Sequence, residues 1–65
     1  MKVKIDYTNW KGQRRTRVIL PIEMFFGKSD WHRGDQWLLN AYDFDATAQR
    51  TFAMKGIHSW EPVAD

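Results

Sequence analysis

The sequence predicts an all-β domain, a small barrel of five or six short antiparallel strands. Three observations predict it. Apolar and polar residues alternate with a period of two in several segments, turn-forming residues separate these segments at short intervals, and aromatic residues make up 15% of the chain. With 65 residues and no Cys, the chain has room for one thin core without disulfides, so residues 1–65 are interpreted as a single domain.

The predicted strands begin with a hairpin. In residues 2–7, Val3, Ile5 and Tyr7 share one face and charged residues share the other. Asn9 and Gly12 suit a chain reversal, because both residue types favour turns. The later strands are predicted at residues 14–20, 22–26, 36–42, 49–54 and 57–60. Residues 22–26 could instead form one helical turn and residues 48–55 a helix, but in both places the strand is favoured.

The second predicted strand has Thr16, Val18 and Leu20 on one face, which leaves Arg15 and Arg17 facing outward. Pro21 is expected to stop its ladder, since proline has no N–H to donate. The polar stretch at residues 27–35 is predicted to be an exposed loop, and residues 43–47 a turn.

The strand at residues 36–42 is predicted to bury Trp37, Leu39 and Ala41, with Leu38 on the outer face. Trp60 is expected in the core and His58 on the surface. Gly56 is predicted to end the preceding strand.

No set of residues resembles a catalytic site, so we expect a protein that is not an enzyme. Asp30, His32 and Asp35 share one loop but lack the spacing of known structural metal sites, and neither a metal nor a cofactor is expected. The N-terminal segment alternates from the start, unlike a secretory signal, and no apolar run is long enough to span a membrane. A cytoplasmic location without a membrane partner is therefore predicted.

Basic residues concentrate in the first half of the chain. Lys11, Arg14, Arg15 and Arg17 follow Trp10, and cations beside an exposed aromatic ring suit phosphates and bases. A solvated strand face is the alternative interpretation of this run. Three residues are candidates for stacking on a ligand: Trp10, Trp31 and His32.

In order and spacing, the chain resembles the WYL domain, a small Sm-like or SH3-like β-barrel found in bacterial regulators of transcription. The matching stretches are residues 5–9 with Gly12, residues 17–22, Trp37-Leu38-Leu39 with Ala41, and residues 50–52 with Ile57. Residues 27–39 resemble a short stand-alone branch of bacterial and phage proteins.

The resemblance implies a regulatory module with a basic pocket for nucleotides or single-stranded nucleic acid. Arg17 and Arg50 coincide with arginines of the family pattern, Leu38 takes the place of its middle Tyr, and Gly56 takes the place of the Arg in its closing Arg-Ile pair. Lys55 is a candidate replacement for that lost charge. With Arg15 added, the predicted ligand-binding residues are Arg15, Arg17, Leu38, Arg50 and Lys55.

We therefore expect a non-catalytic module that binds a phosphate-bearing ligand, with Arg17 and Arg50 contacting the phosphate. The alternative is an adaptor or self-associating module whose aromatic residues and Leu38 pack against a protein partner or a second copy.

Overall fold

The computed structural model describes residues 1–30 and 32–64, and in these ranges all side chains except those of residues 32 and 33. The all-β prediction is confirmed: in the described residues, five antiparallel strands form one sheet and one 3-10 turn is present. In chain order the elements are β1 Lys2–Thr8, β2 Arg14–Ser29, β3 His32–Asp43, β4 Ala48–Ala53, η1 Met54–Gly56 and β5 Ile57–Val63.

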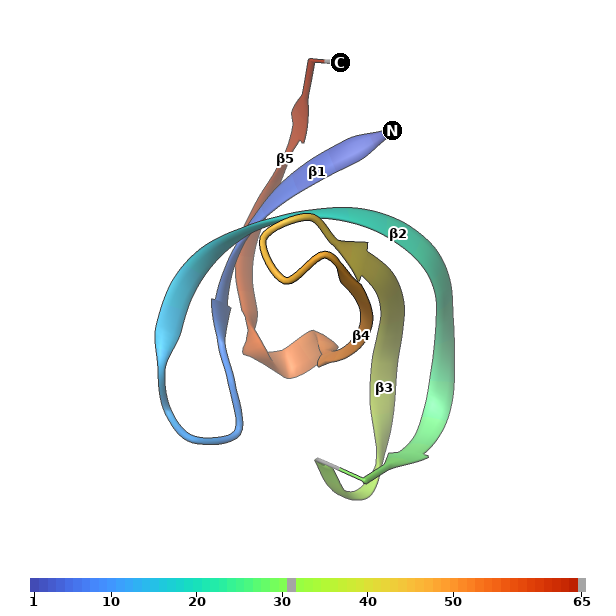
Figure 1. Cartoon of the computed structure of the whole chain (residues 1–65). Helices are drawn as coiled ribbons and strands as arrows, with labels where there is room; N and C mark the ends of the chain where they lie inside the picture. The colour runs from blue at the N-terminus through green and yellow to red at the C-terminus, as the bar shows by residue number, and fades with distance from the viewer. Residues whose placement is uncertain (31, 65) are drawn as a thin grey trace.

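The sheet has the order β4-β3-β2-β1-β5 and curls strongly (Figure 1). β2 arches over the molecule, because its first half pairs with β1 and its second half with β3. The turn η1 joins β4 to β5, which are the two edge strands. Among the described residues no ladder connects these edges, so the curled sheet is open in its hydrogen bonding.

The core lies on the inner face of this curl. It consists of six buried residues from four strands: Ile5, Tyr7, Ile19, Leu39, Ala41 and Phe52. The rings of Tyr7 and Phe52 meet edge to face at 4.9 Å, a geometry that aromatic pairs favour. Burying each large apolar side chain contributes about 1.5–3 kcal/mol, so these few residues supply most of the apolar stabilisation.

The predicted faces of β2 are reversed. Val18, Ile19 and Leu20 are continuous apolar residues, and alternation alone cannot decide which of them faces inward. The pairing of β2 with β1 determines which side chains face the core, because Ile19 lies opposite Val3 and Arg17 lies opposite Ile5. Ile19 is therefore fully buried and Leu20 exposed, and the prediction that Arg17 faces outward is wrong.

The predicted burial of Trp37 and exposure of Leu38 are also wrong. Leu38 is 0% exposed, whereas Trp37 is 53% exposed. Leu38 has partners on both sides, Phe25 on β2 and Ala53 on β4, while the β4 pairing ends at Leu38 and does not reach Trp37. Because β3 is buried on both faces at its centre, where Leu38 and Leu39 are adjacent, a one-sided alternation does not describe it.

The predictions for Trp60, Pro21 and residues 27–35 also need correction. Trp60 is half exposed because β5 is an edge strand paired only with β1. Pro21 does not stop β2; a register shift follows it and the strand continues to Ser29. The predicted loop at residues 27–35 is wrong as well. Residues 27–29 lie in β2 and residues 32–35 in β3, and Ser29 pairs with His32.

The other expected elements are confirmed. Residues 22–26 lie in β2, and residues 48–53 form β4 rather than a helix. The strand ends at Ala53 and not at Gly56, which is the last residue of the turn η1 that follows. The surface position of His58 is also confirmed. No helix in the described part of the chain is long and apolar enough to cross a membrane.

Candidate ligand-binding cleft

The β1–β2 turn is built around the side chain of Asn9. Its Oδ1 accepts the backbone N–H groups of Lys11 and Gln13, both at 2.9 Å, and its Nδ2 donates to Gln13 Oε1 at 3.1 Å. Gly12 has a φ of 81°, a conformation that glycine adopts without strain. The predicted roles of Asn9 and Gly12 are confirmed, and the turn holds Trp10 and Lys11 in a defined position.

A cleft of about 590 Å³ lies between this hairpin and β4. Its volume falls within the range typical of small-molecule sites, roughly 300–1,000 Å³. The lining residues come from the hairpin, β2 and β4: Tyr7, Asn9, Trp10, Lys11, Gln13, Arg17, Gln49, Arg50, Thr51 and Phe52. The cleft therefore combines three cations with amides, aromatic rings and a hydroxyl group.

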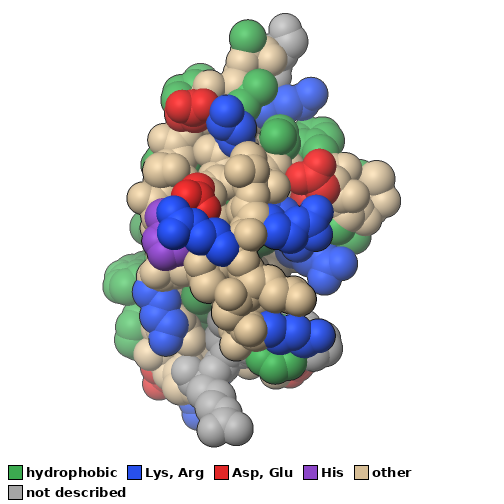
Figure 2. Space-filling view, turned by 90° about the vertical axis from the view of Figure 1, so that its left-hand side faces the viewer, with side chains coloured by type: hydrophobic (Ala, Val, Ile, Leu, Met, Phe, Trp, Pro, Cys, Tyr) green, Lys and Arg blue, Asp and Glu red, His purple; other side chains and the backbone are tan. Residues whose placement is uncertain are grey.

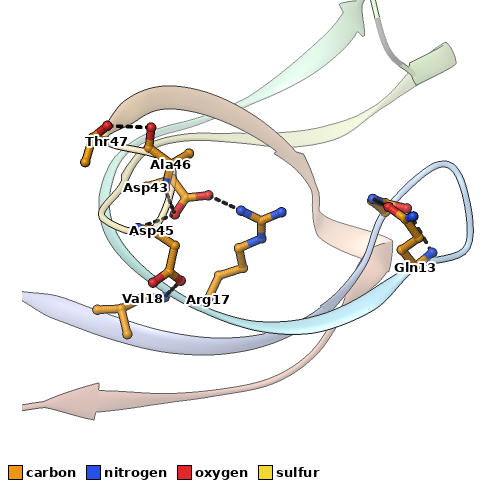
Figure 3. Close-up of polar contacts among 8 residues, drawn as sticks. Gln13, Arg17, Val18, Asp43, Asp45, Ala46 and Thr47 are labelled. Atoms are coloured by element: carbon orange, nitrogen blue, oxygen red, sulfur yellow. Dashed lines mark hydrogen bonds and ion pairs between the residues drawn. The ribbon is translucent and has the colours of Figure 1, made fainter.

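Arg17 is held in the cleft by a buried carboxylate. Its Nη1 donates to Asp43 Oδ2 at 2.8 Å, and Asp43 is fully buried while the Arg17 side chain is 20% exposed. Figure 3 shows the guanidinium extending from β2 to meet Asp43 at the start of the β3–β4 turn. A guanidinium carries five N–H donors, so this bond to Asp43 leaves donors that can face a ligand.

The second oxygen of Asp43 organises the β3–β4 turn. Asp43 Oδ1 accepts the backbone N–H groups of Asp45 at 2.9 Å and Ala46 at 3.3 Å. The N–H of Phe44 donates to the Val18 carbonyl at 3.0 Å, which ties the turn to β2. The predicted turn at residues 43–47 is confirmed, and one carboxylate fixes both this turn and Arg17.

The bottom of the cleft is apolar and uncharged. Tyr7 and Phe52 are both buried core residues, and the Tyr7 hydroxyl accepts the backbone N–H of Ala53 at 3.0 Å. Burial raises the pKa of Tyr7, and the Ala53 N–H and the Arg17 charge offset part of that rise. The phenol thus stays neutral at physiological pH, and the charge in the cleft comes from its cations.

Two other cations on the surface are paired with neighbouring acids. Arg14 donates two bonds to Asp6, at 2.9 and 2.7 Å, and this contact lowers the pKa of Asp6 and raises that of Arg14. Lys4 pairs with Glu61 at 2.9 Å. Figure 2 shows Lys and Arg side chains spread over the side of the molecule that carries the hairpin, some beside a carboxylate.

The family model for the WYL domain matches residues 1–62. The chain belongs to the WYL domain family. The resemblance inferred from the sequence is thereby confirmed over nearly the whole chain. The searches of curated proteins and of solved structures returned no match.

Three of the predicted site residues of this WYL domain line the same cleft. Arg17, Arg50 and Trp10 come from β2, β4 and the hairpin turn, and Trp10 is 59% exposed. Arg15 and Lys55 are exposed but do not line the cleft. The side chains of the other two stacking candidates, Trp31 and His32, lie outside the described residues.

Leu38 and Gly56, at the positions where the resemblance implies a Tyr and an Arg, are structural residues here. Leu38 is fully buried, which contradicts its predicted outward position. A Cβ on Gly56 would lie 2.5 Å from the Thr8 carbonyl oxygen and 2.8 Å from Tyr7 Cε1. No side chain fits at position 56 without a backbone shift, so this domain cannot take the family Arg there in its present geometry.

Sequence reasoning missed Asp43 as the partner of Arg17 and missed the amide groups of Gln13 and Gln49 in the cleft. Arg17 and Asp43 are 26 residues apart, and only the pairing of β2 with β3 brings them together. Lys11 was recognisable as part of the basic run, but its place in the cleft depends on the turn. Within the described part of the chain, no group of three or more metal-ligating side chains is present.

Proposed function

We propose that this WYL domain is a non-catalytic regulatory module that binds a phosphate-bearing ligand, single-stranded nucleic acid or a nucleotide, in the cleft between the β1–β2 hairpin and β4. The observation that carries the proposal is the convergence of Arg17 and Arg50 on one cleft from strands far apart in sequence. Lys11 adds a third cation at the same cleft. Several positive groups around one small concavity suit a phosphate group.

The rigidity of Arg17 supports its role as the main phosphate contact. Asp43 holds one guanidinium nitrogen at 2.8 Å, so the side chain does not have to be ordered when the ligand binds. Planar guanidinium groups bind phosphates through two parallel N–H bonds, which gives geometric selectivity as well as affinity. Arg50 is exposed on β4 and approaches from the other side of the cleft.

Trp10 supports the choice of a nucleotide or single strand over inorganic phosphate. Its ring is exposed at the cleft, with Lys11 Nζ 5.3 Å from the ring centroid. Stacking of a base on an exposed aromatic side chain contributes about 1–3 kcal/mol and tolerates any base. The phosphate would lie toward Arg17 and Arg50, and the base toward Trp10.

The proposal is tested by titrating the ¹⁵N-labelled domain with a short oligothymidylate and, separately, with thymidine monophosphate at low salt. We expect the Trp10 indole and the amides near Arg17 and Arg50 to shift, and the shifts to weaken as salt rises. If only the oligonucleotide causes shifts, the ligand is a strand; if both do, it is a nucleotide unit. Unchanged spectra at millimolar concentrations of both would refute the proposal.

Arg15 provides a matched control for this experiment. It lies on the same strand two residues from Arg17 and is exposed, but it does not line the cleft. We expect Arg17→Ala and Arg50→Ala each to weaken binding by about tenfold or more, the loss of one charge-assisted hydrogen bond, and Arg15→Ala to change it by less than about threefold. Equal losses in all three variants would indicate diffuse electrostatic attraction instead of a site.

A further inference from the structure

The backbone of the β1–β2 turn determines how the side-chain amide of Asn9 is oriented. Asn9 Oδ1 lies 2.9 Å from the N–H groups of both Lys11 and Gln13. A backbone N–H group can only donate, so the Asn9 atom that faces these two groups must be the oxygen. The other end of the amide is therefore Nδ2, which can only donate. Asn9 thus presents a hydrogen-bond donor in a fixed direction within the turn.

This donor fixes the amide of Gln13 in turn. Asn9 Nδ2 lies 3.1 Å from Gln13 Oε1, so Gln13 must direct its oxygen toward Asn9. Gln13 Nε2 is then the end directed away from Asn9, and it has no hydrogen-bond partner among the residues that the structure describes. Gln13 is exposed and lines the cleft. A ligand that contacts the outer end of this amide therefore meets N–H donors.

The cation at the hairpin end of the cleft has the same hydrogen-bonding character. Lys11 Nζ lies 5.3 Å from the centroid of the Trp10 ring, and an ammonium group has N–H donors but no acceptor. Lys11 and Gln13 line the cleft together with Trp10, on which the base stacks in the proposed function. The hairpin end of the cleft thus offers donors to the edge of a base that stacks on Trp10.

Donors at this end favour a base whose exocyclic groups are carbonyl oxygens. Uracil and thymine carry the acceptor O4 where cytosine carries the donor N4 amino group. An amino group against the outer end of the Gln13 amide would set N–H against N–H, and neither group would then have a partner. A donor left without a partner costs more free energy than one ordinary hydrogen bond contributes. The arrangement therefore discriminates between bases by the group at this position.

We propose that Gln13 selects a uracil- or thymine-type base, with carbonyl oxygens and no exocyclic amino group, and that Asn9 sets this preference by orienting the Gln13 amide. The inference rests on the proposed function, because it names the class of base that the nucleotide or single strand carries. Gln13 contacts the base, Lys11 adds a second donor, and Asn9 is a positioning residue.

Deoxyuridine monophosphate and deoxycytidine monophosphate test the selection. They share the sugar, the phosphate and the size of the base, and they differ only in the hydrogen-bonding groups at positions 3 and 4 of the ring. In NMR titrations of the ¹⁵N-labelled domain we expect about threefold to tenfold tighter binding of the uracil nucleotide, the contribution of one ordinary hydrogen bond. Equal affinities would overturn the selection and leave the proposed function standing. No binding of either nucleotide would refute both.

Gln13→Glu exchanges the donor for an acceptor. One carboxylate oxygen can still accept from Asn9 Nδ2, while the other takes the place of Nε2. The preference should turn to the cytosine nucleotide, although the added charge weakens the binding of both. Gln49→Glu is the matched control, because Gln49 lines the cleft from β4 beside Arg50 and its change adds the same charge at the phosphate side. This control should keep the uracil preference, and an equal change of the affinity ratio in both variants would overturn the proposal.

Asn9→Asp tests the positioning role separately. Aspartate keeps an oxygen for the N–H groups of Lys11 and Gln13, but it presents a second acceptor in place of Nδ2. The Gln13 amide should then flip, direct Nε2 toward residue 9 and present Oε1 to the ligand. The ratio of the two affinities should therefore invert without any substitution at Gln13. Amide NMR spectra verify that the turn remains folded, and a folded variant that keeps the uracil preference would overturn the role of Asn9.

Discussion

Replacing Asp43 by Asn tests whether one buried carboxylate holds Arg17 and the β3–β4 turn. The substitution keeps an oxygen that can accept the N–H groups of Asp45 and Ala46, but it removes the charge facing Arg17. Breaking a buried ion pair costs about 3–5 kcal/mol, and a charge-assisted hydrogen bond is worth about 1.5–3 kcal/mol. Because Arg17 is 20% exposed and reaches the water of the cleft, we expect a loss of about 2 kcal/mol.

The loss is large for so small a domain. A chain of this length has a free energy of unfolding of roughly 3–10 kcal/mol, and urea reduces it by about 1 kcal/mol per molar. The midpoint of urea unfolding should therefore fall by about 2 M, measured by Trp fluorescence. Asp45→Asn is the control, since Asp45 is exposed and its carboxylate makes only a 3.4 Å contact with the Val18 N–H.

A double-mutant cycle assigns the effect to the pair. Arg17→Met keeps most of the apolar stem, and combining it with Asp43→Asn should cost about 1.5 kcal/mol less than the sum of the two single changes. Additive losses, or an Asp43→Asn variant within about 0.5 kcal/mol of wild type, would show that the carboxylate does not hold Arg17 and would refute the reasoning.

Three other variants test the burial of Leu38, the close packing around Gly56 and the contact between Asp6 and Arg14. Leu38→Ala should reduce the free energy of unfolding by about 3 kcal/mol in urea titrations, since a fully buried Leu leaves a cavity; a loss below about 1 kcal/mol would argue against its burial. Gly56→Ala should lower the thermal midpoint by several degrees, because the new Cβ meets the Thr8 carbonyl at 2.5 Å, and an unchanged midpoint would contradict that contact. Asp6→Asn should be less stable than wild type at pH 7. Since Arg14 lowers the folded pKa of Asp6 below its usual 3.8, this deficit should disappear as the pH falls through that range, and a deficit independent of pH in urea titrations would exclude the Arg14 contact as its cause.

The sequence was sufficient to predict the all-β class and most of the strands, because β1, the first half of β2 and β3 alternate and turn signals separate them, while residues 22–26 and 48–55 were open between strand and helix. The β1–β2 turn was also predictable, since Asn9 and Gly12 have local roles that depend on few other residues. Burial was predicted less well. Alternation identifies two faces of a strand, but the pairing partners decide which of them is covered.

The candidate cleft was predictable in part. Arg17 and Arg50 were identified from the family pattern, and Trp10 from its place beside a basic run. Arg17 was nonetheless assigned to the outer face, and its partner Asp43 was interpreted only as a turn residue. The face of Arg17 depends on the pairing of β2 with β1, and its contact with Asp43 depends on the pairing of β2 with β3; both registers are long-range properties with no local signal.

A single inserted residue in β2 determines how the two halves of this strand differ. Pro21 pairs with Ala41 and Glu23 with Asn40, so Ile22 is an extra residue on the β2 side. Before this bulge, Ile19 and Pro21 share the inner face with Ala41; after it, the even-numbered residues Met24 and Phe26 do. If Ile22 instead paired with Asn40 in a regular ladder, the inner face of residues 22–29 would carry Glu23, Phe25 and Gly27, and Met24 and Phe26 would not lie on the same face as Trp37. The first half of β2 thus supplies Arg17 to the cleft while the second half places Met24 and Phe26 opposite Leu39 and Trp37, and the bulge lets one strand do both without a loop between them.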